Sequence, residues 1–175
     1  MNPRIAITGL GCVTPLGNDV TTVWQRLIEG QSGAGAITVF DAQRFPVRIA
    51  AEVDNPPGPV GNFTDQQWQR QARQTRFAVA AADLAHQHAN LPNHTDTPTR
   101  TGVYLGCGEI FPDFNQFAQV TCQSLTKRQI EMRDFMEQGL TQFDASDETV
   151  HDPGIATSLV AGLLNAQGPC TNYTA

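Results

Sequence analysis

The 175-residue chain lacks any concentration of basic residues. Its 11 Lys and Arg stand against 17 Asp and Glu, which gives a formal net charge of -6 at pH 7. Binding to nucleic acid or to an anionic membrane needs clustered Lys and Arg that neutralise phosphates, so this composition argues against both partners. The only adjacent basic pair, Lys127-Arg128, fits the solvated face of a helix.

Long apolar segments are also absent. The longest apolar run extends from Phe77 to Ala82, far short of the roughly 20 residues that a membrane-spanning helix requires. No stretch resembles a signal peptide. We therefore expect a cytoplasmic protein that does not insert into a membrane.

Cysteine and histidine are few and scattered. The chain has four of each: Cys12, Cys107, Cys122, Cys170, His86, His88, His94 and His151. Because no two cysteines form a C-x-x-C pair, we expect buried, inert thiols in a reducing compartment. A metal site needs clustered ligands, and His86 and His88, two residues apart, fall on different sides of a helix. We expect no metal and no other cofactor.

What the chain does contain is a set of strand-like segments. Alternating or continuous apolar residues predict strands at residues 5–8, 47–53, 101–108 and 171–175. The first is expected to be buried and the second half-buried. The third ends in glycines and is typical of a central parallel strand. Because the sequence stops inside the fourth, we expect residues 1–175 to form one amino-terminal domain that is incomplete at its C-terminal end.

Between these strands, apolar residues recur at helical spacing in three stripes. The stripes are Val20, Val23, Trp24, Leu27 and Ile28; then Phe77, Ala81, Leu84 and Ala85; then Ile155, Leu159 and Leu163. The many alanines around the second stripe predict a helix packed between layers. Residues 114–140 are weakly periodic and predict broken helical pieces.

Capping residues mark where these helices begin. Asn18 or Asp19 can cap the first helix. Thr64 and Gln67 form a capping box that opens a short helix before the Ala-rich one. Asp152-Pro153 places a cap directly before a proline at the first helical position. Strands that alternate with helices predict an α/β fold, with a mostly parallel mixed sheet and helices on both faces.

Two glycine motifs each allow a functional and a structural interpretation. Gly9-Leu10-Gly11 follows a predicted strand, as in dinucleotide-binding loops, but Thr14 stands where a third glycine is required. A structural tight turn is therefore favoured. Gly106-Cys107-Gly108 could present a reactive thiol, but no histidine base is near in sequence. We favour the structural interpretation, in which these small residues lie where two backbone segments cross.

Residues 5–17 (IAITGLGCVTPLG) closely resemble the opening of the elongating β-ketoacyl-acyl-carrier-protein synthases. The similarity continues through residues 30–33, 37–42, 45–53, 76–82, 102–108 and 168–175. It covers essentially the whole chain, and only residues 109–150 depart from it noticeably. The resemblance implies the amino-terminal half of a thiolase-like fold, which is usually paired as a homodimer.

The resemblance also implies a reaction and a partner. Synthases of this family are acyltransferases that join an acyl thioester to malonyl-acyl carrier protein by decarboxylative Claisen condensation, in fatty-acid or polyketide synthesis. A cysteine at a helix N-terminus carries the acyl group, and two histidines assist decarboxylation. We expect acyl carrier protein as partner, together with a second copy or a missing C-terminal half.

No residue of this chain matches the family's catalytic positions. The nucleophile is expected just after Ala175, and Cys170 precedes that position, so neither it nor any of the four histidines receives a catalytic role. The chain alone is therefore predicted to be inactive. Ile110 and Phe111, apolar where a loop is normally polar, are predicted to bind the acyl substrate, although simple packing explains them about as well. A non-catalytic, truncated or scaffolding subunit is the alternative function.

Overall fold

The computed structural model describes residues 4–91, 97–108 and 113–174. Its helices are α1 (Val20–Ile28), α2 (Asp65–Arg70), α3 (Arg73–His88), α4 (Phe114–Gln123), α5 (Met132–Gln142), α6 (Ala145–Thr149) and α7 (Pro153–Leu163), with a 3-10 turn at Pro98–Arg100. Its strands are β1 (Ala34–Ala36), β2 (Ile49–Ala51), β3 (Val103–Cys107), β4 (Leu125–Thr126), β5 (Gln129–Ile130) and β6 (Cys170–Thr174). None of the described helices has the length and apolarity needed to cross a bilayer.

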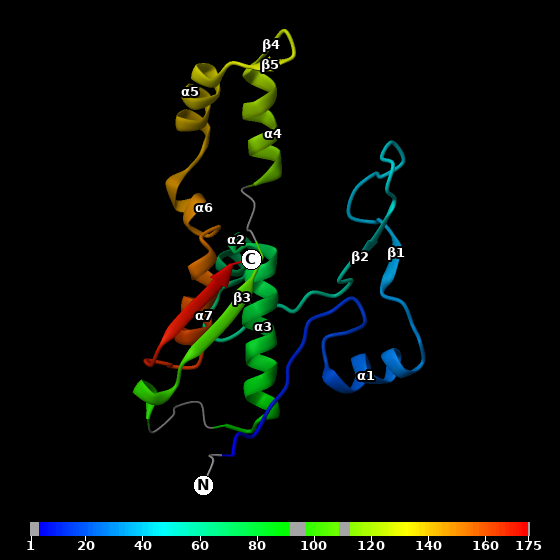
Figure 1. Ribbon diagram of the computed structural model, residues 1–175, viewed down its shortest axis with the longest axis vertical. Coiled ribbons are helices and arrows are strands. Elements are labelled where there is room, and N and C mark those ends of the chain that lie inside the picture. Colours follow the sequence, from blue (N-terminus) through cyan, green and yellow to red (C-terminus); the bar gives the residue numbers. More distant parts are fainter. Residues whose placement is uncertain (1–3, 92–96, 109–112, 175) are drawn as a thin grey trace.

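The packed part of the molecule, which we call the body, consists of α2, α3, α7, β3 and β6 (Figure 1). The strands β3 and β6 run parallel, from the pair Val103–Cys170 to the pair Cys107–Thr174. Helix α7 packs against both strands and against α3. The buried core joins α2, α3, β3 and α7 through Trp68, Val79, Ala80, Val103 and Val160. The predicted α/β architecture with a parallel pair is therefore present.

Helices cover the β3–β6 pair on one face only within the described residues. Side chains alternate along β3, so that Val103 is buried while Tyr104 on the opposite face is exposed. Tyr173 of β6 is exposed as well. The predicted second layer of helices is not supplied by the described part of the chain, and this bare surface is called the open face below.

The predicted caps are present. The Asp19 carboxylate accepts from the Thr22 amide at 2.8 Å, and Thr64 with Gln67 forms the capping box of α2. Asp152 accepts from the Gly154 amide at 2.6 Å, directly before α7. Helix α1 ends where Gly30 adopts φ +71°, a left-handed conformation that glycine tolerates without a Cβ clash.

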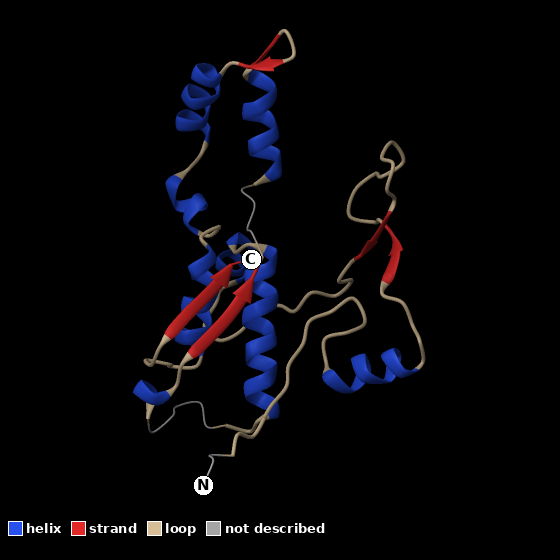
Figure 2. Cartoon of the chain, in the orientation of Figure 1, coloured by secondary structure: helices blue, strands red, loops and turns tan. Residues whose placement is uncertain are grey.

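Two extensions leave the body (Figure 2). The first, called the arm, contains α1 and the antiparallel pair β1–β2. The second, called the helical hairpin, runs from α4 through the short β4–β5 ribbon to α5. Its helices meet through an edge-to-face contact of Phe117 and Phe135, with ring centroids 6.0 Å apart. Residues 114–140 thus form broken helices, as predicted, and β4–β5 is an additional element.

The amino-terminal strand prediction is wrong in this structure. Residues 5–8 pair with no strand in the part of the chain that the structure describes, and Ile5 is 95% exposed. The segment that follows lies along α3 instead, so closely that a Cβ on Gly9 or Gly11 would collide with the helix backbone. The glycine motif therefore permits close packing on α3, a role that differs from a dinucleotide loop and also from the predicted tight turn, since the turn forms later, at residues 14–17. This contact also places the Ala-rich helix α3 between α7 and the amino-terminal segment.

Other burial predictions also need correction. The predicted strand at 47–53 is reduced to β2, and it lies exposed in the arm because no layer of described residues covers it. Cys122 and Cys170 are exposed, not buried. In α7, the fully buried residues are Ala156, Thr157 and Val160, whereas the predicted stripe is only half-buried, because α3 and the sheet contact a neighbouring face of the helix.

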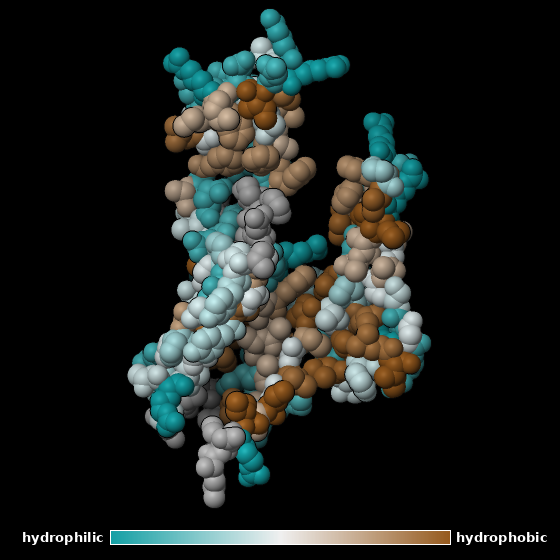
Figure 3. All heavy atoms as spheres, in the orientation of Figure 1, coloured by the Kyte–Doolittle hydropathy of each residue, from teal (hydrophilic) through white to brown (hydrophobic). Residues whose placement is uncertain are grey.

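The chain exposes far more surface than a compact monomer of its size. Its accessible area is 12729 Å² for 19.0 kDa, whereas a compact protein of this mass exposes about 8,400 Å². Much of the excess is apolar: Figure 3 shows hydrophobic residues gathered on the arm and on the helical hairpin. These surfaces need a cover, from another protein segment or another chain.

Candidate functional site

The carboxyl ends of β3 and β6 form the candidate site. In parallel sheets, ligands bind beyond the carboxyl ends of the strands. Both α3 and α7 run opposite to the strands, so their amino-terminal ends lie at this same edge (Figure 1). Because helix N-termini carry positive partial charge, the edge is suited to a group that develops negative charge.

Two buried hydroxyls lie near the beginnings of these helices, one in the first turn of α3 and one in the second turn of α7. Thr75 of α3 is fully buried and Thr157 of α7 is 4% exposed. Neither hydroxyl oxygen has a hydrogen-bond partner among the described residues. Because buried polar groups normally have partners, these two hydroxyls are exceptions within the body.

Cys107 ends β3 and is half-buried beside Asn172 of β6. Its thiol donates to the Asn172 side-chain oxygen across 3.3 Å. An amide oxygen is not a base that can take up the thiol proton, so this contact does not activate Cys107 as a nucleophile. The pair instead links the two strands at the edge of the site.

The glycines on either side of Cys107 are not where backbones cross, which corrects the structural interpretation of this motif. A Cβ on Gly106 or Gly108 would meet no atom of the described residues within 4 Å. The crossing lies at the other end of β3, where a Cβ on Gly102 would come within 2.8 Å of the Pro169 carbonyl oxygen. The glycine-flanked end of β3 therefore borders open space on the uncovered side of the sheet.

The other thiols and imidazoles do not assemble a site in the described part of the chain. Burial raises the pKa of the Cys12 thiol, and the neighbouring Asp19 carboxylate raises it further. The exposed Cys170 faces the carbonyl oxygen of Gly168, and His88 accepts a hydrogen bond from the Leu10 amide at 3.0 Å. Among the described residues, no group of three or more His, Cys, Asp and Glu could hold a metal ion.

A basic cluster at the α2–α3 junction was missed from the sequence. It consists of Arg70, Arg73 and Arg76, and it lies where α3 begins without a side-chain cap. Burial lowers the pKa of Arg76, and Arg73 lowers it further, while Arg76 donates to the Gln69 side-chain oxygen at 2.9 Å. Arg73 and Arg76 are three residues apart in α3 and so share one side of a helical turn, which was a usable signal, whereas Arg70 precedes the break at Gln71 and Ala72.

The predicted acyl-binding residues Ile110 and Phe111 lie outside the described residues. The structure resumes at Asp113, whose carboxylate accepts from the Gln116 amide at 2.9 Å and caps α4. The segment that contains both residues therefore joins the carboxyl edge of β3 to the helical hairpin.

Comparison with known proteins gives a family match along nearly the whole chain. Residues 2–174 match the family described as "Beta-ketoacyl synthase, N-terminal domain". A curated relative, 3-oxoacyl-[acyl-carrier-protein] synthase 2 of Staphylococcus aureus (strain COL), is 29% identical over 96% of this chain and 37% of its own length. The protein of the same name from Coxiella burnetii is 43% identical over 60% of this chain and 25% of its own length.

Solved structures show the same fold. The ishigamide ketosynthase/chain length factor superimposes with a TM-score of 0.64 at 23% identity, over 96% of this chain and 39% of its own. A type II polyketide ketosynthase in complex with its acyl-carrier protein gives 0.63 at 21% identity, over 97% and 37%. The chain has the thiolase-like α/β fold of these proteins and spans little more than a third of their length.

Proposed function

Because this chain belongs to the β-ketoacyl synthase family, as its amino-terminal domain, we propose that it supplies the amino-terminal part of a 3-oxoacyl-[acyl-carrier-protein] synthase. The match over residues 2–174 carries this proposal. The reaction is an acyl transfer with carbon–carbon bond formation. Malonyl thioester loses carbon dioxide, and the resulting carbanion attacks the acyl thioester and expels the enzyme's thiolate.

In this proposal the body positions a catalytic group that the chain itself does not contain. Strand β6 leads to the carboxyl edge, where the nucleophilic cysteine is expected just beyond Ala175. Within the chain, the amino-terminal ends of α3 and α7 contribute positive partial charge at this edge. Cys107 and Asn172 tie the strands together there, and no described residue is assigned as nucleophile or base.

The partner that we propose is an acyl carrier protein, which docks on the basic cluster. The chain is acidic overall, yet Arg70, Arg73 and Arg76 fall within seven residues at the positive end of α3. An acidic carrier surface would be attracted to this cluster. The type II polyketide ketosynthase that shares this fold forms a complex with its own acyl-carrier protein. Such a reaction would take place in the cytoplasm.

We further propose that Ile110 and Phe111 contact the growing acyl chain and that the open face is covered by a second copy or by a C-terminal half. Phe111→Ala, in the chain completed by that half, should alter chain-length preference. An unchanged product profile would remove these residues from the substrate site.

The deciding experiment compares the chain alone with the chain plus a C-terminal half taken from a curated relative. With acyl- and malonyl-carrier protein, the 175-residue chain should form no ketoacyl product, whereas the reconstituted pair should. Turnover by the chain alone that is lost in Cys107→Ser or Cys170→Ser would show that we misassigned the thiol. A pair that assembles without turnover would favour the alternative function, a non-catalytic scaffolding subunit.

A further inference from the structure

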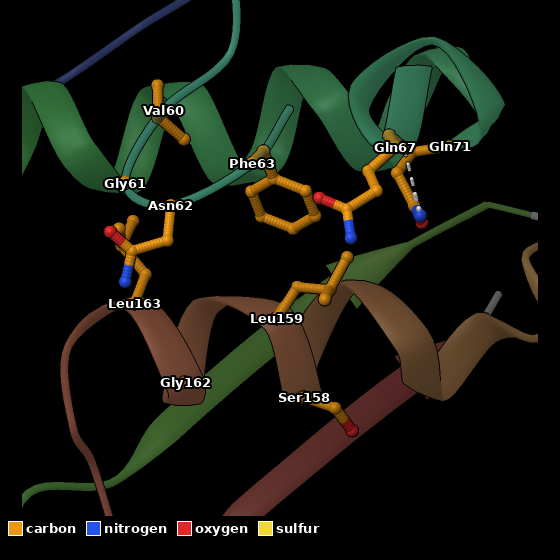
Figure 4. A pocket seen from close by; sticks show the side chains of 10 residues that line it. All are labelled: Val60, Gly61, Asn62, Phe63, Gln67, Gln71, Ser158, Leu159, Gly162 and Leu163. Atoms are coloured by element: carbon orange, nitrogen blue, oxygen red, sulfur yellow. Dashed lines mark hydrogen bonds between the residues drawn. The ribbon is translucent and has the colours of Figure 1, made fainter. Parts of the chain in front are cut away.

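A cavity of about 480 Å³ lies on the side of α7 that faces away from the strands. Its apolar lining is Val60, Phe63, Leu159 and Leu163, contributed by the loop before α2 and by α7. Helix α7 separates the cavity from β3 and β6 (Figure 4), so it belongs neither to the carboxyl edge nor to the open face. Its volume falls within the range of small-molecule sites, roughly 300–1,000 Å³.

Among the described residues that line the cavity, none is charged. Its polar members are the side chains of Asn62, Gln67 and Gln71, together with Ser158. The Ser158 hydroxyl already donates to the Gly154 carbonyl oxygen, and its side chain points away from Phe63 in Figure 4. Transfer of an unpaired charge into such surroundings is strongly unfavourable, so the lining selects an uncharged occupant.

Two glutamine side chains leave one acceptor and one donor for that occupant. The Gln71 side-chain oxygen is buried and has no hydrogen-bond partner among the described residues, while its nitrogen donates to the Gln67 carbonyl oxygen at 3.4 Å. The Gln67 side-chain oxygen is used by the Thr64 cap, which leaves its amide nitrogen directed toward Leu159 (Figure 4). An unmatched buried acceptor costs stability until a donor reaches it.

We propose that this cavity binds a small uncharged amphiphile, a molecule with an apolar ring or chain and one primary or secondary amide. The ligand N–H donates to the Gln71 oxygen, and the ligand carbonyl accepts from the Gln67 amide nitrogen. The apolar part lies between Phe63 and Leu159. Binding here is independent of the condensing reaction, because the site lies outside the candidate active site.

The chain offers a matched pair of variants at Leu159, whose side chain points into the cavity (Figure 4). Leu159→Trp adds a large ring to the lining and fills much of the cavity, whereas Leu159→Met keeps nearly the same volume and leaves it open. The unfolding temperature of each variant is measured beside the labelling. Loss of labelling in the tryptophan variant, with cooperative unfolding retained in both variants, then reports a filled cavity and not a misfolded protein.

The test uses a trifluoromethyl-diazirine derivative of benzamide as photolabel on the 175-residue chain, with peptides mapped by mass spectrometry. Saturable labelling is expected in peptides that contain residues 60–71 and 158–163. The N,N-dimethylamide, which has no N–H, should label with about fivefold to tenfold weaker affinity, the effect of one hydrogen bond. Gln71→Met should weaken the benzamide label and Gln66→Met, in α2 but outside the cavity, should not.

Four results would overturn the proposal. The first three are equal labelling in Leu159→Trp and wild type, label confined to the arm or the helical hairpin, and equal affinity of the two amides. Non-saturable labelling would mean that solvent alone fills the cavity, which also overturns it. None of these outcomes bears on condensing activity, so the proposed function is tested separately.

Discussion

The body and the arm contain the same sequence signals with opposite results. Each has a capped helix with one tryptophan on its apolar side. Trp68 of α2 is 1% exposed and donates its indole N–H to the Pro57 carbonyl oxygen, whereas Trp24 of α1 is 65% exposed. Amphipathic periodicity thus specifies a helix and its apolar face, but burial depends on a partner layer. The body has one, whereas no described residues supply one to the arm.

The strongest test of this contrast is association of the chain. Its surface exceeds that of a compact monomer by about 4,300 Å², which is as large as obligate interfaces of about 2,000–5,000 Å². At micromolar concentration we expect self-association and binding of a hydrophobic dye, measured by light scattering and fluorescence. Addition of the C-terminal half should suppress both. A monodisperse monomer that unfolds cooperatively would mean that the arm and hairpin need no cover.

The second-largest expected difference is between alanine substitutions of the two tryptophans, which should change the free energy of unfolding to different extents. Trp68→Ala should lower the free energy of unfolding by about 3–5 kcal/mol, because it leaves a cavity in the core. Trp24→Ala should change it by about 0.5 kcal/mol or less in the chain alone. Urea denaturation followed by far-ultraviolet circular dichroism measures both. Equal effects would show that α1 is buried in solution.

The glycines provide a smaller contrast of the same kind. A methyl group on Gly11 collides with the backbone of α3, while one on Gly106 meets open space. Gly11→Ala should therefore cost about 1–3 kcal/mol, and Gly106→Ala about 0.5 kcal/mol or less, as judged by denaturation midpoints. If a covering half is added, Gly106→Ala should then weaken its binding. A neutral Gly11→Ala would argue against the close packing on α3.

The smallest effect is the pH dependence of the arm. Hydrogen bonds from Thr22 lower the pKa of Asp19 below its usual 3.8. Because the folded pKa is the lower one, its contribution to α1 is complete above pH 3.8 and disappears as pH falls through the folded pKa. Helicity of α1 should decline below pH 3.8 more in the wild type than in Asp19→Asn, which keeps a capping oxygen without titrating. Identical pH profiles would contradict this role.

The sequence predicts local structure well wherever the cause is local. The caps at Asp19, Thr64 and Asp152 depend on neighbours within three residues, and all three are present. The buried strand at residues 5–8 was predicted from apolar alternation, which needs a neighbouring strand to be realised, and the described residues supply none. Cys122 and Cys170 were predicted to be buried and are exposed for the same reason, because the described residues supply no layer that covers them.

The candidate site was harder to foresee than the fold. The family resemblance gave the reaction, and the match over residues 2–174 confirms the family, while Ile110 and Phe111 stay predictions. The basic cluster was missed because its arginines are not adjacent in sequence. The cavity beside α7 was not predictable, because it depends on how the loop at 60–63 meets a helix about 100 residues later.

The tip of the helical hairpin has a practical consequence. Its turn is formed by Lys127 and Arg128, both exposed and both at positive φ, and Lys127 is the sole lysine of the chain. Apart from the terminal amine, one ε-amino group is therefore the only target for amine-reactive reagents. A single fluorophore or cross-linker placed there would report whether any added protein reaches the far end of the hairpin, without introducing a mutation.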